Sequence, residues 1–197
     1  MPAKSQLEIL RQKAELAKGL CENVGDENNW FFGPLKRQAQ DLAGGGMVLY
    51  HGSQKTTDPV REWSNNRFKE EQLGLHLSTR MDTAITFAGS KNGFIYCFGV
   101  RGMRPLEIRD DLGLWHTSKW VDKKPRLLQR LGWDDSIRIS PSFFLQRGHN
   151  AIGYYNQREE PVGAKCYIIL DTAIVKPVMI IDLSKPDDEC VVFSSKG

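Results

Sequence analysis

The sequence has no apolar run long enough to cross a membrane. Nowhere do 18 apolar residues follow one another, whereas a spanning helix needs about 20. A signal peptide would need an uninterrupted apolar stretch near the N-terminus, but Lys4, Arg11 and Lys13 interrupt this one. We therefore expect a cytoplasmic protein that does not engage a membrane.

Cysteine is also scarce. The four cysteines, at positions 21, 97, 166 and 190, form no CxxC pair and show no metal-ligand spacing to histidine. Cys97 and Cys166 lie inside apolar, strand-like runs, which predicts buried, reduced thiols. We therefore expect neither a disulfide framework nor a bound metal.

The chain has little net charge, because 27 Lys and Arg residues nearly balance 24 Asp and Glu residues and leave a net value of +3. The segment from Arg101 to Arg147 is the exception, because ten Lys and Arg residues stand there against six Asp and Glu. This local excess could attract a phosphate-bearing ligand such as RNA, and Trp115, Trp120 and Trp133 could stack on bases. The alternatives are a solvated surface and tryptophans that belong to the core.

Hydrophobic periodicity divides the chain into two parts. It predicts helices over residues 5–20 and from Pro34 to about Leu42, and three glycines at 44–46 then break the pattern. We predict a helical N-terminal extension over residues 1–45 and one domain over residues 46–197. The length of 197 residues allows one sizeable core.

The second part is rich in short apolar runs. They predict strands over residues 47–51, 74–78, 94–100, 151–155, 167–170 and 178–183. Helices are predicted after a cap at Ser78 or Thr79, with Asp82 in the first turn, and near residues 117–131 and 141–147. Because strands and helices do not alternate regularly, we predict an α+β fold with antiparallel pairing.

A few residues stand where chemistry often occurs. His51 directly follows a buried strand and precedes Gly52, and His76 holds a similar place on the next strand. Glu159 and Glu160 lie in a turn before the strand at 167–170. Residues in such positions often have no functional role. The order of these residues along the chain is therefore a stronger indication of function than any one of them.

Four segments follow one another in a characteristic order. They are Leu49-Tyr50-His51-Gly52-Ser53; Gly74-Leu75-His76-Leu77-Ser78-Thr79, with Phe87 eleven residues beyond His76; Phe94–Phe98 with Arg104–Ile108 and Asp111-Leu112-Gly113; and Gly153–Pro161 with Tyr167–Asp171 and Ile174–Val178. Over residues 47–180 they resemble the diphtheria-toxin-like and poly-ADP-ribose-polymerase-like ADP-ribosyltransferases, in particular a bacterial and phage branch.

The resemblance implies an enzyme that consumes NAD⁺. It implies split mixed β-sheets around an NAD⁺ cleft, and transfer of one ADP-ribose to a macromolecular acceptor, either a protein or an RNA or DNA base. A toxin or effector, for instance in phage defence, is the implied role. The N-terminal helices either bind an antitoxin or chaperone or pack on the core.

The resemblance also implies a role for individual residues. Glu159 would be catalytic, beside the 2′-hydroxyl of the nicotinamide ribose, and Asn156 and Gln157 would face the acceptor. The implied NAD⁺ contacts are His51, Gly52, Ser53 and Ser78, together with His76 and Phe87, whose rings would sandwich nicotinamide.

One residue departs from the pattern of these transferases, and it leaves the catalytic carboxylate and the activity open. Cys166 stands where the polymerase-like members have their catalytic glutamate. Either Glu159 or its neighbour Glu160 supplies the carboxylate, or the chain is an inactive binding module with the transferase fold. A third alternative is an NAD⁺ glycohydrolase, in which water is the acceptor.

Overall fold

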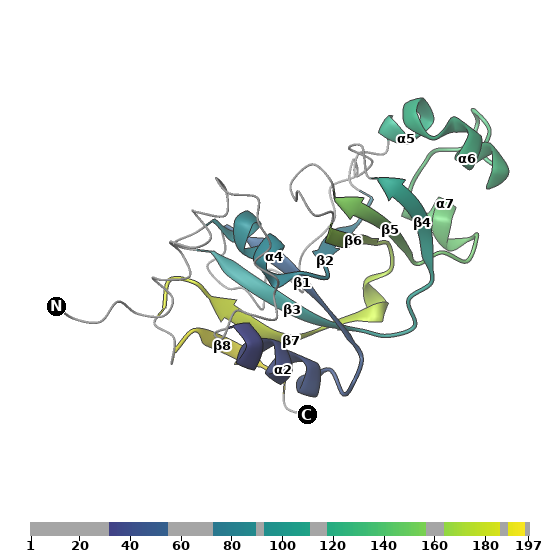
Figure 1. The fold of residues 1–197 in the computed structure, drawn as a ribbon. Coiled ribbons are helices and arrows are strands. Elements are labelled where there is room, and N and C mark those ends of the chain that lie inside the picture. The colour runs from purple at the N-terminus through teal and green to yellow at the C-terminus, as the bar shows by residue number, and fades with distance from the viewer. Residues whose placement is uncertain are drawn as a thin grey trace. The chain divides into compact units, whose positions relative to one another are not determined.

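One mixed β-sheet organises the protein (Figure 1). The computed structural model describes residues 32–54, 73–89, 93–110, 118–156, 164–185 and 189–195. Within these residues the strands are β1 (Met47–Ser53), β2 (Leu75–Ser78), β3 (Phe94–Val100), β4 (Pro105–Asp110), β5 (Ala151–Asn156), β6 (Ala164–Ile169), β7 (Val175–Asp182) and β8 (Val191–Ser194). The helices are α2 (Phe32–Leu42), α4 (Met81–Ala88), α5 (Ser118–Lys123), α6 (Pro125–Arg130), α7 (Pro141–Leu145) and a short 3₁₀ helix, η2 (Thr172–Ile174).

The eight strands lie in the order β4-β5-β6-β2-β1-β3-β7-β8. Strand β1 pairs antiparallel with β2 and β3, and β3–β7, β5–β6 and β7–β8 are antiparallel too, whereas β4 runs parallel to β5. The predicted α+β class is therefore confirmed. The sheet is single, however, where the resemblance implied split sheets.

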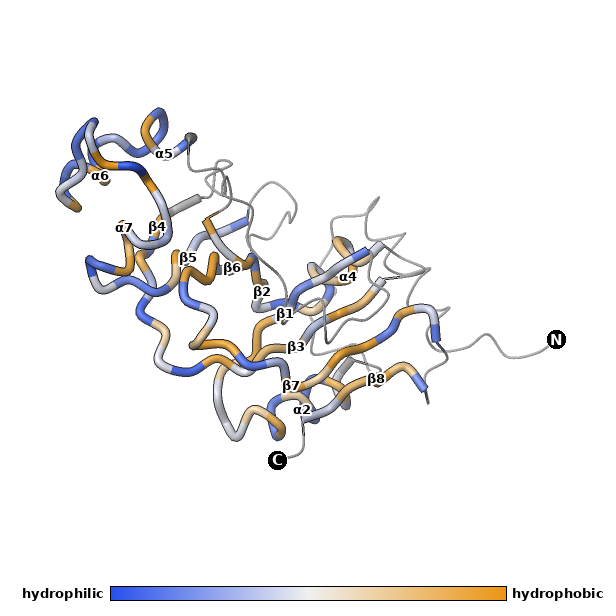
Figure 2. Tube along the Cα trace, turned by 180° about the vertical axis from the view of Figure 1, so that it is seen from behind, coloured by the Kyte–Doolittle hydropathy of each residue, from blue (hydrophilic) through white to orange (hydrophobic). Residues whose placement is uncertain are grey.

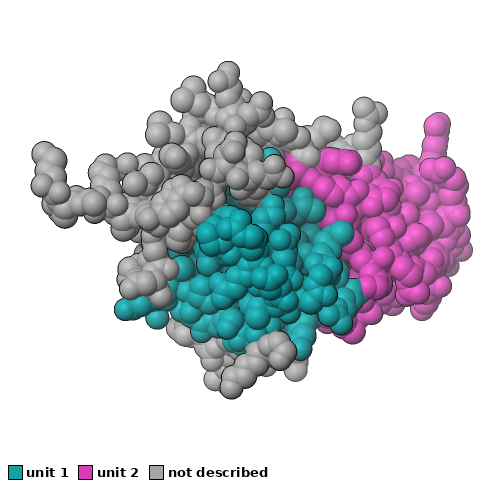
Figure 3. All heavy atoms as spheres, turned by 60° about the horizontal axis from the view of Figure 1, so that its bottom comes forward, with its two compact units in different colours: residues 1–65, 78–101, 175–197 teal, residues 66–77, 102–174 magenta. Residues whose placement is uncertain are grey.

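The chain divides into two compact units that interleave in sequence (Figure 3). The first unit comprises residues 1–65, 78–101 and 175–197, and the second comprises residues 66–77 and 102–174. Helix α2 lies in the first unit with β1, β3 and β7. Whether residues 1–45 form a separate extension stays a prediction, because residues 1–31 are outside the described part.

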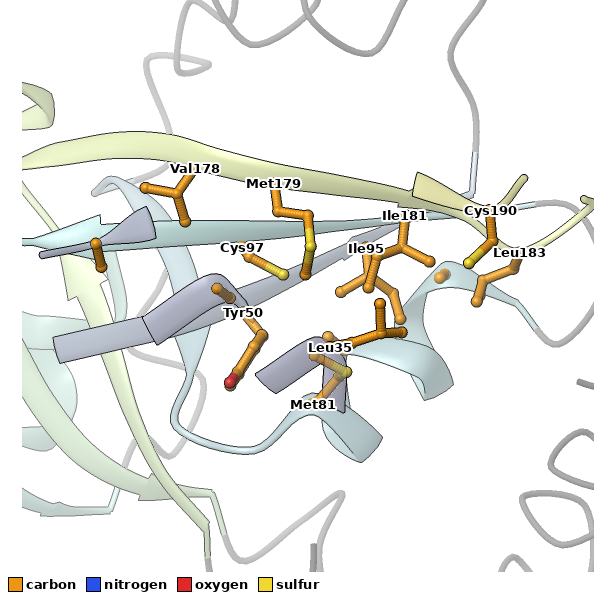
Figure 4. Packing of buried hydrophobic residues seen from close by; sticks show 14 residues of the cluster. Leu35, Tyr50, Met81, Ile95, Cys97, Val178, Met179, Ile181, Leu183 and Cys190 are labelled. Carbon is orange, nitrogen blue, oxygen red and sulfur yellow. The ribbon is translucent and has the colours of Figure 1, made fainter. Parts of the chain in front are cut away.

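In the first unit, helices α2 and α4 cover one face of the strands. Alternate residues of a strand point to opposite faces, and Tyr50, Ile95 and Cys97 point to the face that the helices cover. Figure 4 shows Leu35 of α2 and Met81 of α4 packed among them. The other residues of this cluster are Ala39, Ala43, Ala84, Ala88, Val178, Met179, Ile181, Leu183 and Cys190.

In the second unit, the short helices α5, α6 and α7 pack over β4, β5 and β6. Trp120 of α5 is fully buried, and its ring lies 4.9 Å from that of Phe144 in α7. Leu128 is the buried residue of α6. These side chains share a core with Ile108, Ile152 and Ile168 of the strands, so the core fixes the helices to the sheet.

Several local expectations are corrected. The predicted helix at 117–131 is two helices, because Pro125 disfavours a helical backbone at Lys124, whose φ and ψ are −129° and 37°. Helix α4 has Arg80 at its N-cap position, without a side-chain cap, because β2 continues through Ser78. The Ser78 hydroxyl instead accepts a hydrogen bond from the Arg80 amide at 3.0 Å. Asp82 does lie in the first turn.

Two further expectations can be compared with the structure. Cys97 and Cys166 are buried free thiols, as predicted, and so is Cys190. Burial raises the pKa of the Cys97 thiol, so this side chain is an inert part of the core. In the part of the chain that is described, no helix is long and apolar enough to cross a membrane.

Candidate functional site

The end of β1 carries His51 and Ser53 on the same face of the sheet. This is the face opposite to Tyr50, and therefore opposite to the helices. His51 is half-buried and is the register partner of Tyr96 on β3, with the ring centroids 6.1 Å apart. The Tyr96 ring in turn stacks on Phe98, at 6.1 Å and an interplanar angle of 7°. A row of three rings thus leads to the strand end.

Gly52 lies between these two residues and faces the helix side. A Cβ atom at this position would lie 1.8 Å from the carbonyl oxygen of Ala84 and 2.7 Å from the amide nitrogen of Ala88. The missing side chain therefore lets the backbone of α4 approach β1. This packing role exists independently of the predicted contact with NAD⁺.

Two other predicted contact residues of the first unit differ in accessibility. Ser78 is buried, and it pairs with Tyr50 across β1 and β2. Phe87 is 44% exposed on α4, a helix on the face opposite to the His51 side chain. An exposed phenyl ring is free to receive a ligand, whereas Ser78 already accepts the Arg80 amide.

In the second unit, His76 is linked to β5. Its Nδ1 atom lies 3.0 Å from the hydroxyl oxygen of Tyr154, and the two rings meet edge to face at a centroid distance of 6.1 Å. Tyr154 was not among the predicted site residues. It lies two positions before Asn156 on β5, so both point to the same face. Asn156 is 2% exposed, so its amide faces protein atoms.

The predicted catalytic Glu159 lies outside the described residues, as do Glu160 and Gln157. The residues that flank this segment, Asn156 and Ala164, are register partners at the ends of β5 and β6. Residues 157–163 therefore connect two adjacent positions of one antiparallel pair. The carboxylates at 159 and 160 belong to the connection that begins directly after the Tyr154 and Asn156 strand.

Cys166 pairs with Tyr154 across β5 and β6. Its side chain belongs to the apolar core of the second unit and is 3% exposed. A thiol in this environment is no substitute for an ionised carboxylate. If the site is catalytic, its negative charge must come from another residue.

The opposite face of β4, β5 and β6 carries a charged and aromatic group. Lys165 forms an ion pair with Glu107, and its ammonium lies 5.0 Å from the ring centroid of Tyr155 and 5.6 Å from that of Tyr167. Gly153 makes the pair possible, because a Cβ atom there would lie 2.7 Å from the Glu107 carboxylate. Burial raises the pKa of the Tyr167 phenol, while the Lys165 charge opposes the shift.

Among the residues that the structure describes, no group of three or more His, Cys, Asp and Glu side chains is arranged to hold a metal ion. Comparison of the chain with protein-family models, with curated proteins and with solved structures finds no match.

Proposed function

We propose that the protein is an ADP-ribosyltransferase that uses NAD⁺ as its substrate. The observation that carries the proposal is the His76–Tyr154 hydrogen bond of 3.0 Å. It joins the predicted nicotinamide-binding strand to β5, the strand that leads into the connection with Glu159. Two motifs that are about 80 residues apart in sequence thus meet in one compact unit.

The proposed reaction breaks the bond between C1′ of the ribose and the nicotinamide nitrogen. Nicotinamide leaves with the bonding electron pair, and C1′ then bonds to a heteroatom of the acceptor, which loses a proton. Because the ribose becomes cation-like on the way, a carboxylate beside it lowers the barrier. Glu159 has this role in the proposal and also accepts a hydrogen bond from the 2′-hydroxyl.

The other residues orient the cofactor. His76 offers a flat ring for nicotinamide, and the Tyr154 hydroxyl restrains the orientation of that ring through Nδ1. The exposed ring of Phe87 is the second proposed stacking surface. His51 and Ser53 point to the sheet face opposite to α4, so their proposed contacts with the ribose or adenosine are an alternative to the Phe87 contact and not an addition to it. In this proposal the mixed sheet is a version of the transferase fold, and the acceptor is a macromolecule met by a toxin or effector.

The test measures nicotinamide released from NAD⁺ by the purified protein. Glu159→Gln keeps the size and shape of the side chain but removes its charge, so release should fall by about 10²–10³-fold. Glu160→Gln is the matched control and should stay within about threefold of wild type, on the same rate scale. If the control loses activity instead, Glu160 takes the role, and if neither variant slows release, the carboxylate mechanism is wrong.

The buried Cys166 favours one second candidate, a binding module that has kept the fold and lost catalysis. Such a module would bind NAD⁺ and release no nicotinamide. Calorimetric titration with NAD⁺, run beside the release assay, separates the two candidates. If nicotinamide is released but no ADP-ribose becomes attached to a macromolecule, the protein is instead a glycohydrolase.

A further inference from the structure

Positive charge is concentrated in the helical part of the second unit. Residues 118–150 contain seven Lys and Arg against three Asp, a net charge of +4, whereas the whole chain has +3. The remainder of the chain is therefore slightly negative, with a net charge of −1. Such an asymmetry creates a local positive potential on a nearly neutral protein.

The cationic side chains of α5 and α6 lie at the surface. Lys119, Lys123, Arg126 and Arg130 are exposed, and we call them the basic face. Hydrophobic and hydrophilic residues alternate along these helices (Figure 2). Trp120 and Leu128 enter the core, so the basic residues are presented on a fixed scaffold, while Val121 of α5 is exposed.

Helix α6 offers the most specific part of this face. Arg126 and Arg130 are one helical turn apart and, with Gln129, line an open hollow of about 660 Å³. Two guanidinium groups and one amide provide many hydrogen-bond donors, and arginine matches phosphate oxygens in a bidentate geometry. Among the described residues, the lining consists of these three polar side chains and includes no apolar one that could anchor a protein interface.

Acidic side chains do not neutralise the two arginines. Helix α6 contains no Asp or Glu, and within the described ranges neither Arg126 nor Arg130 forms an ion pair. The nearest acids in sequence are the exposed Asp122 of α5, four residues before Arg126, and Asp134, four residues after Arg130. The amide and hydroxyl of Ser136 donate to Asp134 and lower its pKa, so this carboxylate is engaged locally.

Arg147, Trp120 and Trp133 are engaged within the protein. The Arg147 guanidinium donates to backbone carbonyls of Leu131, Gly132 and Phe143, so it is structural. Trp120 is fully buried, and the Trp133 indole donates to the Ile137 carbonyl at 2.7 Å. Of the two alternatives for the tryptophans, Trp120 therefore belongs to the core and does not stack on bases, while Trp115 lies outside the described residues. What the face offers is recognition of a phosphate backbone rather than of bases.

We propose that the basic face binds the phosphodiester backbone of a nucleic acid, and that RNA or DNA is the acceptor. The assignment of RNA or DNA as the acceptor rests on the proposed function, whereas the binding of nucleic acid does not. Transfer would bond C1′ of the ADP-ribose to a heteroatom of the nucleic acid, with release of nicotinamide and one proton. Because the contacts are to phosphates, binding should be independent of sequence and sensitive to salt.

The binding test uses fluorescence anisotropy of a labelled 20-mer without NAD⁺, as single-stranded RNA, single-stranded DNA and duplex DNA. With about four phosphate contacts to a single strand, raising the salt from 50 to 200 mM should weaken binding about 50-fold. The double variant Arg126→Glu/Arg130→Glu should weaken it at least about tenfold at 50 mM salt. The control Lys176→Glu/Lys185→Glu makes the same charge change at exposed residues of the first unit and should have little effect.

Each other result decides against the proposal. Absence of binding to all three probes, or equal losses in both double variants, would overturn the basic face as the binding surface. Polyglutamate that binds as tightly as the oligonucleotides would assign the face to an acidic protein. The acceptor is tested separately by the mass of the RNA and DNA after incubation with NAD⁺. Nicotinamide release without added mass would overturn the acceptor alone, while binding without nicotinamide release would overturn the proposed function alone.

Discussion

Replacement of Gly52 by alanine tests whether this residue serves packing, cofactor binding or both. The added Cβ would lie 1.8 Å from the Ala84 oxygen, where ordinary contact begins at 3.4 Å. Helix α4 would have to move by the difference, 1.6 Å. Both colliding groups are backbone atoms, so no side-chain rotation relieves the overlap.

The expected loss of stability follows from that geometry. Overpacking typically costs about 1–3 kcal/mol, and a clash with helix backbone belongs at the upper end. For a chain of this size about 3 kcal/mol lowers the melting temperature by about 6–12 °C. Differential scanning calorimetry measures this shift directly.

Gly33→Ala is the matched control. Among the described residues, a Cβ at position 33, in the first turn of α2, would meet only the Arg37 guanidinium at 3.6 Å, which is ordinary contact. Alanine also favours a helix over glycine by up to about 1 kcal/mol. The control should therefore melt at or above the wild-type temperature. A Gly52→Ala protein that melts within about 2 °C of wild type, on the same scale, would refute the packing argument. If such a protein also failed to bind NAD⁺, Gly52 would be a cofactor residue only.

Three further predictions concern single side chains. Tyr154→Phe removes the hydroxyl that is hydrogen-bonded to His76. The free energy of unfolding, measured with urea, should fall by about 1 kcal/mol, and nicotinamide release should become slower. If both values stay unchanged, the proposed role of this bond is wrong. Because burial raises the pKa of Tyr167 above 10.0, the native state binds the phenolic proton more tightly, so stability should fall as the pH rises above about 10. Tyr167→Phe should make that fall shallower, and an identical slope would refute the assignment. Ellman's reagent should find at most one reactive thiol in the native protein and four after denaturation, because Cys97, Cys166 and Cys190 are buried.

Strands with a strong local signal could be predicted from the sequence. Phe94–Val100 is β-branched or aromatic at most positions, and its bounds agree with those of β3. Strand β4 was not predicted, because Pro105, Glu107 and Asp110 argue against a strand. Its place depends on tertiary contacts: Asn150 accepts from the Arg104 amide and donates to the Gly102 carbonyl, which aligns β4 with β5. No local pattern encodes such a bond.

In the candidate site, too, contacts that arise from strand pairing could not be predicted from the sequence. His51 and His76 could be selected from the sequence because each lies in a short apolar run that predicts a strand. The predicted strand end at His51 is wrong, however, because β1 continues to Ser53, and His76 is the second residue of β2. Tyr96 and Tyr154 could not, because their relevance arises only from strand pairing. The His76–Tyr154 contact joins residues 78 positions apart. Alternation within β5 could have indicated that Tyr154 shares a face with Asn156, but it could not have identified His76 as the partner.

The pairing of Asn156 with Ala164 has a consequence for engineering. The two anchor positions are set by the β5–β6 ladder, so the sheet fixes where an insert would begin and end. Doubling the length of such an insert costs only about 0.6 kcal/mol in closure entropy. Variants that keep Glu159 and Glu160 and lengthen the connection between positions 156 and 164 are therefore expected to leave the β5–β6 pairing intact.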